Sequence, residues 1–332
     1  MSVRAMYEKD ADLSILTTKR FAIIGYGNQG HAHALNLRDA GANVMVGQRP
    51  GASFDRAVAD GFAPVDVETA VARADVIILG LPDEDIGRVY QRHIASGLRA
   101  GQAIGFVHGF AVRFGLVEAP EGVDVIMVAP KGPGALVRSA FERGGGLTCI
   151  VAVDRDASGR AREIALAWGA GVGGGKGGMI EATFAQECES DLFGEQSVLC
   201  GGVQELMKVA FELLVEAGVP EELAYFECIH EVKQVVDLQY TDGLAGMRRR
   251  ISNTASYGGL TRGPRIIDDS VRQRMRDALH EIQQGAFARE WIAECESGKR
   301  RLAALEAAEA AHASEPAGRA VRSLAAGAIR SV

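Results

Sequence analysis

The sequence predicts an α/β amino-terminal domain followed by an all-α carboxy-terminal domain. Residues 21–150 alternate short apolar runs with helical stretches, a spacing typical of βαβ units and a mainly parallel sheet. From about residue 181 the strand-like runs end and long helical patterns follow. We therefore expect two domains, residues 1–182 and residues 183–328.

The apolar runs show where each element is expected. The predicted strands are Phe21–Gly25, Val44–Gly47, Val76–Leu79, Ala103–Phe106, Val125–Ala129 and Leu147–Val153. A glycine-rich stretch at residues 169–178 ends this region. The helices predicted beyond it are Phe193–Ala217, Pro220–Tyr240, Asp268–Gly285 and Phe287–Ala313. The last stretch, rich in Ala, Glu and Arg, is expected to be a surface helix with a loose tail.

Composition excludes several classes of protein. The 332 residues are 47% hydrophobic and 24% charged, which is ordinary for a soluble globular protein. A net charge of −7 argues against a general binder of nucleic acids or anionic membranes. No apolar run reaches the roughly 18 residues that span a bilayer, and no signal peptide is visible. The five cysteines lack close metal-type spacing, so we expect a reduced, cytoplasmic protein.

A glycine fingerprint follows the first predicted strand. The pattern G-x-G-x-x-G lies between a buried strand and a helix predicted from His31 to Ala40, the context that dinucleotide binding requires. The first glycine permits a tight turn, the second lets the backbone approach a pyrophosphate, and the third lets helix and strand pack closely. The alternative is an ordinary glycine turn. The expected cofactor-binding residues are Gly25, Tyr26, Gly27, Asn28, Gln29 and Gly30.

The end of the second strand favours NADP over NAD. An NAD site usually places Asp or Glu there to bind the ribose 2′-hydroxyl, but this chain has Gln48 and Arg49. Arg49 can neutralise a 2′-phosphate and Ser53 can donate a hydrogen bond to it. The acidic Asp55 lies only slightly later and is the main argument for NAD.

Polar residues follow several other predicted strands. Pro82 and Asp83 lie in a strand-to-helix turn near the expected cofactor edge, and His108 follows the strand that ends at Phe106. Lys131 comes after the next strand, shortly before Gly134. Ligands of open α/β sheets bind at the carboxyl ends of the strands, so these positions are candidates for cofactor or substrate contacts. From its position alone, His108 fits a purely structural role equally well.

Two pairs of carboxylates lie in the predicted helical domain. Asp191 and Glu195 are four residues apart, as are Glu227 and Glu231. Residues four apart share a helix face, where like charges repel unless a cation lies between them. Most such pairs lie on solvated faces, but both of these have apolar neighbours. Carboxylates among apolar residues must be paired, neutralised or metal-bound, so the pairs predict a divalent-metal site beside a nicotinamide.

Together these motifs resemble ketol-acid reductoisomerase, also called acetohydroxy-acid isomeroreductase, in its short class I form. The resemblance covers nearly the whole chain and is most specific in the helical domain. The stretches that carry it are residues 7–13, 25–32, 107–110, 129–134, 191–196, 199–202, 225–231 and 251–255.

The resemblance implies roles for individual residues. Asp191 would bridge two Mg²⁺ ions, Glu195 would help to hold the first, and Glu227 and Glu231 would serve the second. Ser252 would bind the substrate carboxylate. His108 and Lys131 would lie around metal and substrate, and Glu231 is the candidate for proton transfer. The family's helical domain is knotted and forms a dimer, so Glu227, Glu231 and Ser252 would act in the active site of the partner subunit.

The implied reaction explains these residue types. An alkyl group of 2-acetolactate or 2-aceto-2-hydroxybutyrate migrates from C2 to C3, and NADPH then reduces the resulting 2-oxo acid in branched-chain amino acid biosynthesis. Mg²⁺ is a hard Lewis acid that prefers carboxylate ligands. We expect a homodimer with a shared active site, open to higher assembly, with neither nucleic-acid nor membrane partners.

Some positions depart from the family pattern, and two other functions are open. Ala135 stands where the family usually has His, Ser256 where it has Glu, and Gln48 where it commonly has Leu; residues 237–243 are also altered. A metal-independent β-hydroxyacid dehydrogenase would use a Lys such as Lys208, but Glu212 stands where those enzymes have Asn. A catalytically silent NADP-binding regulator is the other alternative, and the retained acidic pairs argue against it.

Overall fold

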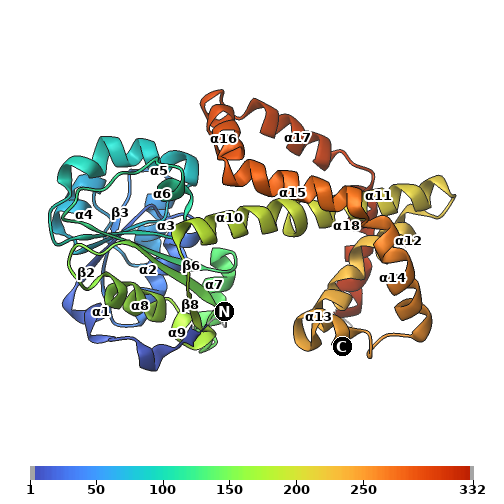
Figure 1. Ribbon diagram of the computed structural model, residues 1–332, viewed down its shortest axis with the longest axis horizontal. Coiled ribbons are helices and arrows are strands. Elements are labelled where there is room, and N and C mark those ends of the chain that lie inside the picture. Colours follow the sequence, from blue (N-terminus) through green and yellow to red (C-terminus); the bar gives the residue numbers. More distant parts are fainter. Residues whose placement is uncertain (1–3, 330–332) are drawn as a thin grey trace. The chain divides into compact units, whose positions relative to one another are not determined.

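The computed structural model describes residues 4–329 of the chain. Contacts between Cα atoms divide the chain into two compact units, residues 1–190 and 191–332. The first unit is α/β and the second consists of helices (Figure 1). No helix within the described residues is long and apolar enough to cross a membrane. All five cysteines lie within the described residues, and none of them forms a disulfide.

The first unit contains one eight-stranded sheet with the order β1-β8-β7-β6-β5-β4-β2-β3. Strands β3, β2, β4, β5 and β6 are mutually parallel, so their carboxyl ends lie at one edge of the sheet. The strands are β1 (Ala5–Met6), β2 (Arg20–Ile24), β3 (Asn43–Gly47), β4 (Val76–Leu79), β5 (Ala103–Phe106), β6 (Asp124–Pro130), β7 (Cys149–Arg155) and β8 (Met179–Glu181).

The sheet differs from the prediction at its β1–β7 side. Strand β7 is antiparallel to β6, and β1 is antiparallel to β8. Neither β1 nor β8 was predicted, because they have two and three residues and so lack a readable apolar alternation. An apolar run also carries no information about strand direction, so the antiparallel pairing of β7 could not be predicted.

Helices cover both faces of the sheet (Figure 1). One apolar core joins α2 and α8 to the sheet, and the other joins α4, α5 and the π-helical turn η2 to its opposite face. The helices of this unit are η1 (Glu8–Asp10), α1 (Ser14–Thr18), α2 (Asn28–Asp39), α3 (Ala52–Ala59), α4 (Val67–Arg73), α5 (Asp83–Val89), η2 (Tyr90–Ile94), η3 (Ala95–Gly97), α6 (Phe110–Arg113), α7 (Gly134–Glu142), α8 (Ala161–Gly171) and α9 (Gly174–Gly177).

The second unit is helical throughout its described elements. Helix α10 begins in the first unit and crosses the division at residues 190/191. The elements are α10 (Phe184–Gly194), η4 (Glu195–Leu199), α11 (Gly202–Glu216), α12 (Glu221–Tyr225), η5 (Phe226–His230), α13 (Val232–Met247), α14 (Asn253–Ile266), α15 (Asp269–Gln283), α16 (Ala286–Glu296), α17 (Arg300–Ala310) and α18 (Ser314–Ile329).

The predicted helices of this unit are broken more often than expected. The stretch Phe287–Ala313 divides at Gly298 and Lys299, which both have positive φ. Helix α14 was not predicted. The prediction of a loose tail was also wrong, because α18 packs Ala317 and Val321 against Tyr225. In addition, the Arg322 guanidinium donates to the Tyr225 hydroxyl at 2.8 Å.

Two of the breaks are π-helical turns that coincide with the acidic pairs. In η4 the amide of Cys200 donates to the carbonyl of Glu195 at 2.8 Å. In η5 the amide of Glu231 donates to the carbonyl of Phe226 at 3.0 Å. Such i→i+5 turns inside helices are frequent at functional sites. The pairs therefore lie on helices as predicted, but at irregular turns.

Candidate active site and cofactor pocket

The glycine turn has the geometry that its sequence pattern predicts. Gly25 follows β2 with φ +92°, and a Cβ placed there would lie 2.8 Å from the carbonyl oxygen of Gly80. A Cβ on Gly30 would lie 2.1 Å from the carbonyl oxygen of Gly25, so only glycine allows this approach of helix and strand. A Cβ on Gly27 would meet nothing within 4 Å. Helix α2 begins at Asn28, three residues before the predicted start.

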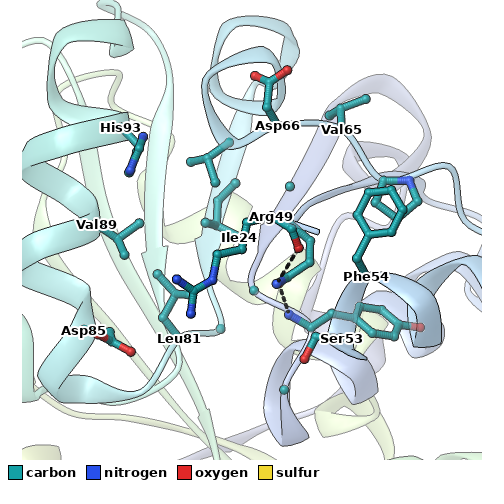
Figure 2. A pocket seen from close by; sticks show the side chains of 18 of the residues that line it. Ile24, Arg49, Ser53, Phe54, Val65, Asp66, Leu81, Asp85, Val89 and His93 are labelled. Carbon is teal, nitrogen blue, oxygen red and sulfur yellow. Dashed lines mark hydrogen bonds between the residues drawn. The ribbon is translucent and has the colours of Figure 1, made fainter. Parts of the chain in front are cut away.

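A pocket of about 560 Å³ opens beside this turn, at the carboxyl ends of the parallel strands (Figure 2). Six of the predicted cofactor residues line it: Gly25, Tyr26, Gly27, Arg49, Ser53 and Pro82. The other five, Asn28, Gln29, Gly30, Asp83 and Gly134, are not among its lining residues. Gly134 instead packs against the turn, because a Cβ there would lie 2.0 Å from the carbonyl oxygen of Asn28.

Charges inside the pocket are mostly paired. Asp85 and Arg88 form one ion pair, and Glu68 and His93 lie 2.5 Å apart. Arg49 is exposed and forms no ion pair with any residue between 4 and 329. It is therefore the cation in this pocket that can take up an added anionic group.

A buried carboxylate that the sequence analysis missed organises the candidate catalytic residues. Glu187 is 1% exposed. One of its carboxylate oxygens, Oε1, accepts from Lys131 Nζ at 2.5 Å, and the other, Oε2, accepts from the Gly109 amide at 2.8 Å. The Nδ1 atom of His108 lies 3.1 Å from Oε2. The structure thus brings His108 and Lys131 together, as the sequence analysis expected, around a residue that it did not single out.

The charges in this network sustain one another. Burial acts to lower the pKa of His108, but hydrogen bonds with Cys188 and Glu187 and the Glu187 charge raise it to about 11. Burial likewise acts to raise the pKa of Glu187, and His108 and Lys131 outweigh it, so that this pKa is lowered. A carboxylate held between two cationic groups stays ionised although it is buried.

Asp191 continues helix α10 one turn beyond Glu187. His108, Glu187 and Asp191 each place one potential ligand atom within 4.8 Å of the others. Lys131 and the Gly109 amide already occupy Glu187, and Mg²⁺ prefers oxygen to imidazole nitrogen. A Mg²⁺ ion therefore fits the carboxylates of Asp191 and Glu195 better than His108 or Glu187. Glu187, Asp191 and Glu195 are spaced four apart, a signal in the sequence that could have identified Glu187.

The other predicted metal ligands are exposed in the single chain. Glu195, Glu227 and Glu231 are all exposed, and none belongs to a three-residue ligand cluster within the described part of the chain. Exposed carboxylates are solvated and can stay ionised without a cation. In the single chain, the apolar neighbours of these residues in sequence therefore do not impose the need for a metal ion that was expected.

Ser252 is the amino-terminal cap of α14. Its Oγ atom accepts from the amide of Ala255 at 3.1 Å. The hydroxyl proton is thereby left to donate, and the start of a 14-residue helix favours negative charge. Both features suit a carboxylate ligand.

Lys208, the residue of the dehydrogenase alternative, has a structural role. It forms ion pairs with Glu205 and with Glu309, the latter at 2.9 Å, and its side chain is 20% exposed.

Comparison with known proteins gives one family for both parts of the chain. Residues 15–178 match the family described as acetohydroxy acid isomeroreductase, NADPH-binding domain, and residues 184–326 match ketol-acid reductoisomerase, C-terminal domain. A solved structure of an NADH-preferring ketol-acid reductoisomerase from an uncultured archean is 43% identical. Its TM-score is 0.93, and the match covers 97% of this chain and 99% of that chain.

More distant structures share only the fold. A semialdehyde dehydrogenase NAD-binding protein from Cupriavidus necator is 20% identical with a TM-score of 0.63, covering 81% of this chain and 99% of that chain. A pyrroline-5-carboxylate reductase from Coxiella burnetii is 14% identical with a TM-score of 0.56, covering 81% and 98%.

Proposed function

Because this chain belongs to the ketol-acid reductoisomerase family, we propose that it isomerises and reduces 2-acetolactate or 2-aceto-2-hydroxybutyrate with NADPH and two Mg²⁺ ions. The observation that carries this proposal is the buried network of His108, Lys131 and Glu187 one helical turn from Asp191. Family membership also decides against the metal-independent dehydrogenase, whose candidate Lys208 is paired elsewhere.

The residues of the network suit an anionic, oxygen-rich substrate. When bound, Mg²⁺ supplies Lewis-acid polarisation of the substrate oxygens and NADPH supplies hydride. Lys131 and His108 carry positive charge that Glu187 fixes in place, so they can orient the substrate without rearranging. Asp191 and Glu195 offer the hard oxygen donors that Mg²⁺ requires.

We propose that a second copy of the chain completes the site. Glu227, Glu231 and Ser252 are exposed in the single chain, and the large side chains of Tyr240 and Leu244 on α13 are 93% and 72% exposed. Exposed apolar area of this kind marks an interface. A partner that covers it would bring the three polar residues to the active site of the other subunit, with Glu231 as the proton-transfer group.

Two observations support NADPH as the reductant. Arg49 is the unpaired cation of the pocket, and Ser53 lies in the first turn of α3, where helix amides favour phosphate. The archaeal relative prefers NADH, and the ratio of kcat/KM for NADPH to that for NADH tests the preference proposed for this chain.

One assay tests the proposal. We expect NADPH oxidation with 2-acetolactate that depends on Mg²⁺, is abolished by EDTA and falls at least a hundredfold in Asp191→Asn. Asp154→Asn is the matched control, because Asp154 is exposed and outside the site. Activity that persists in excess EDTA would overturn the metal requirement. Tight NADPH binding without turnover would favour the silent regulator.

A further inference from the structure

The side chain of Gln48 joins the glycine turn to the loop that carries Arg49. Its Oε1 atom accepts from the Tyr26 amide at 3.1 Å, and its Nε2 atom donates to the Arg49 carbonyl at 3.3 Å (Figure 2). One amide group thus links two backbone segments that lie 22 residues apart in sequence. Both segments line the cofactor pocket.

The rest of this loop is fixed at its two ends. At its start, the Gln48 amide donates to the Val65 carbonyl at 2.9 Å. At its end, Gly51 has φ +143°, a conformation that is essentially restricted to glycine, and caps α3. Pro50 fixes its own φ. The segment between these points contains Arg49, and the Gln48 amide holds the carbonyl of that residue.

We propose that Gln48 is a positioning residue for cofactor selection, and that it acts by holding the Arg49 backbone ready for the 2′-phosphate. The inference rests on the proposed role of Arg49 in NADPH binding. A loop backbone that is ordered before binding loses less entropy when the ligand arrives, so this tie between the loop and the glycine turn strengthens the Arg49–phosphate contact. Gln48 is also neutral, and a carboxylate at this strand end would repel a 2′-phosphate while accepting from a 2′-hydroxyl.

The tie through Gln48 also determines which backbone amides of the glycine turn are left to bind the pyrophosphate. Because Gln48 accepts from the Tyr26 amide, that N–H is satisfied by the protein and is not left for the pyrophosphate. NADH and NADPH share the pyrophosphate and differ only at the 2′ position. Loss of the tie should therefore weaken NADPH binding more than NADH binding.

The test measures binding of both nucleotides to the full-length protein by fluorescence titration without metal or substrate. Gln48→Met keeps the length of the side chain and removes both hydrogen bonds. We expect the Kd for NADPH to rise about three- to tenfold and the Kd for NADH to change less than twofold. Gln91→Met is the control, because Gln91 is exposed on the same domain and does not line the pocket.

Two further variants separate positioning from general structure. Gln48→Glu can still accept from Tyr26 but cannot donate to Arg49 and adds a negative charge, so NADPH affinity should fall further while NADH affinity is kept. Arg49→Met should weaken NADPH binding about tenfold or more. If Gln48 acts through Arg49, the double variant Gln48→Met/Arg49→Met should bind NADPH no worse than Arg49→Met alone.

The outcomes distinguish this inference from the proposed function. The positioning role alone would be overturned if the rise in the Kd for NADPH in the double variant equalled the product of the rises in the two single variants. It would also be overturned if Gln48→Met left NADPH affinity unchanged while Arg49→Met weakened it. If Arg49→Met kept the wild-type ratio of NADPH to NADH affinity, Arg49 would not bind the 2′-phosphate. Gln48 could then not act on NADPH binding through Arg49 either.

Discussion

The Nζ atom of Lys131 lies 2.5 Å from Oε1 of Glu187, although 56 residues separate them in sequence. Lys131 follows β6 and Glu187 lies on α10, so the contact ties helix α10 to the carboxyl end of the sheet. Asp191, the first of the carboxylates proposed to bind Mg²⁺, follows one turn later on the same helix.

Removing the Glu187 charge should cost both stability and activity. In Glu187→Gln, Lys131 and His108 lose the buried anion between them, and burial then opposes the charge on His108. We expect the free energy of unfolding in denaturant to fall by about 2–4 kcal/mol, with kcat at least a hundredfold lower. Glu163→Gln removes an exposed ion pair with Arg160 and should change stability by less than about 0.5 kcal/mol. Equal effects of the two variants would contradict the special role of Glu187.

Two glycines of the cofactor site should respond differently to alanine. In Gly134→Ala the new methyl group would lie 2.0 Å from the Asn28 carbonyl oxygen, so the backbone must move and thermal stability should fall. In Gly27→Ala the methyl group meets nothing within 4 Å and φ is −80°, so the melting temperature should stay close to that of the wild type. That methyl group would nevertheless stand where the pyrophosphate approaches, and the Kd for NADPH should rise at least tenfold. A Gly27→Ala protein with wild-type affinity would place the pyrophosphate elsewhere.

The sequence predicted those features that depend on neighbouring residues. The glycine turn after β2 could be anticipated because tight backbone approach requires specific residues at fixed spacing. The spacing of Glu187, Asp191 and Glu195 could have marked Glu187 as a candidate, but its contacts with Lys131 and His108 could not be predicted, because only the fold brings these residues near. The antiparallel β7 and the packed helix α18 were missed for the same reason: direction and burial depend on partners distant in the chain.

The capping and substrate-binding roles of Ser252 can be separated by two substitutions. Ser252→Ala removes the cap of α14 and should lower stability by about 1 kcal/mol and raise the KM for 2-acetolactate. Ser252→Asp restores a cap, so stability should recover. Its charge repels the substrate carboxylate, so KM should stay at least tenfold above the wild-type value. Asp268→Ala removes the cap of α15 and should change stability alone. A wild-type KM in Ser252→Asp would exclude substrate binding by this residue.

The buried His33 should make the protein sensitive to mild acid. Its Nδ1 atom accepts from Trp168 Nε1 at 3.0 Å, and burial lowers its pKa from 6.5 to about 3. Below pH 6.5 the unfolded chain binds a proton at this residue and the folded chain does not, so stability is present above that pH and is lost as pH falls toward 3.

Urea unfolding at pH 7 and pH 5 measures this contribution. Between these values His33 should remove about 2 kcal/mol from the free energy of unfolding. His33→Asn keeps an acceptor for Trp168 without titrating, so its loss over the same interval should be smaller by that amount. His280→Asn replaces an exposed histidine and should behave like the wild type. If His33→Asn and the wild type lose stability equally between pH 7 and pH 5, then His33 is protonated in the folded protein and the Trp168 hydrogen bond does not hold it neutral.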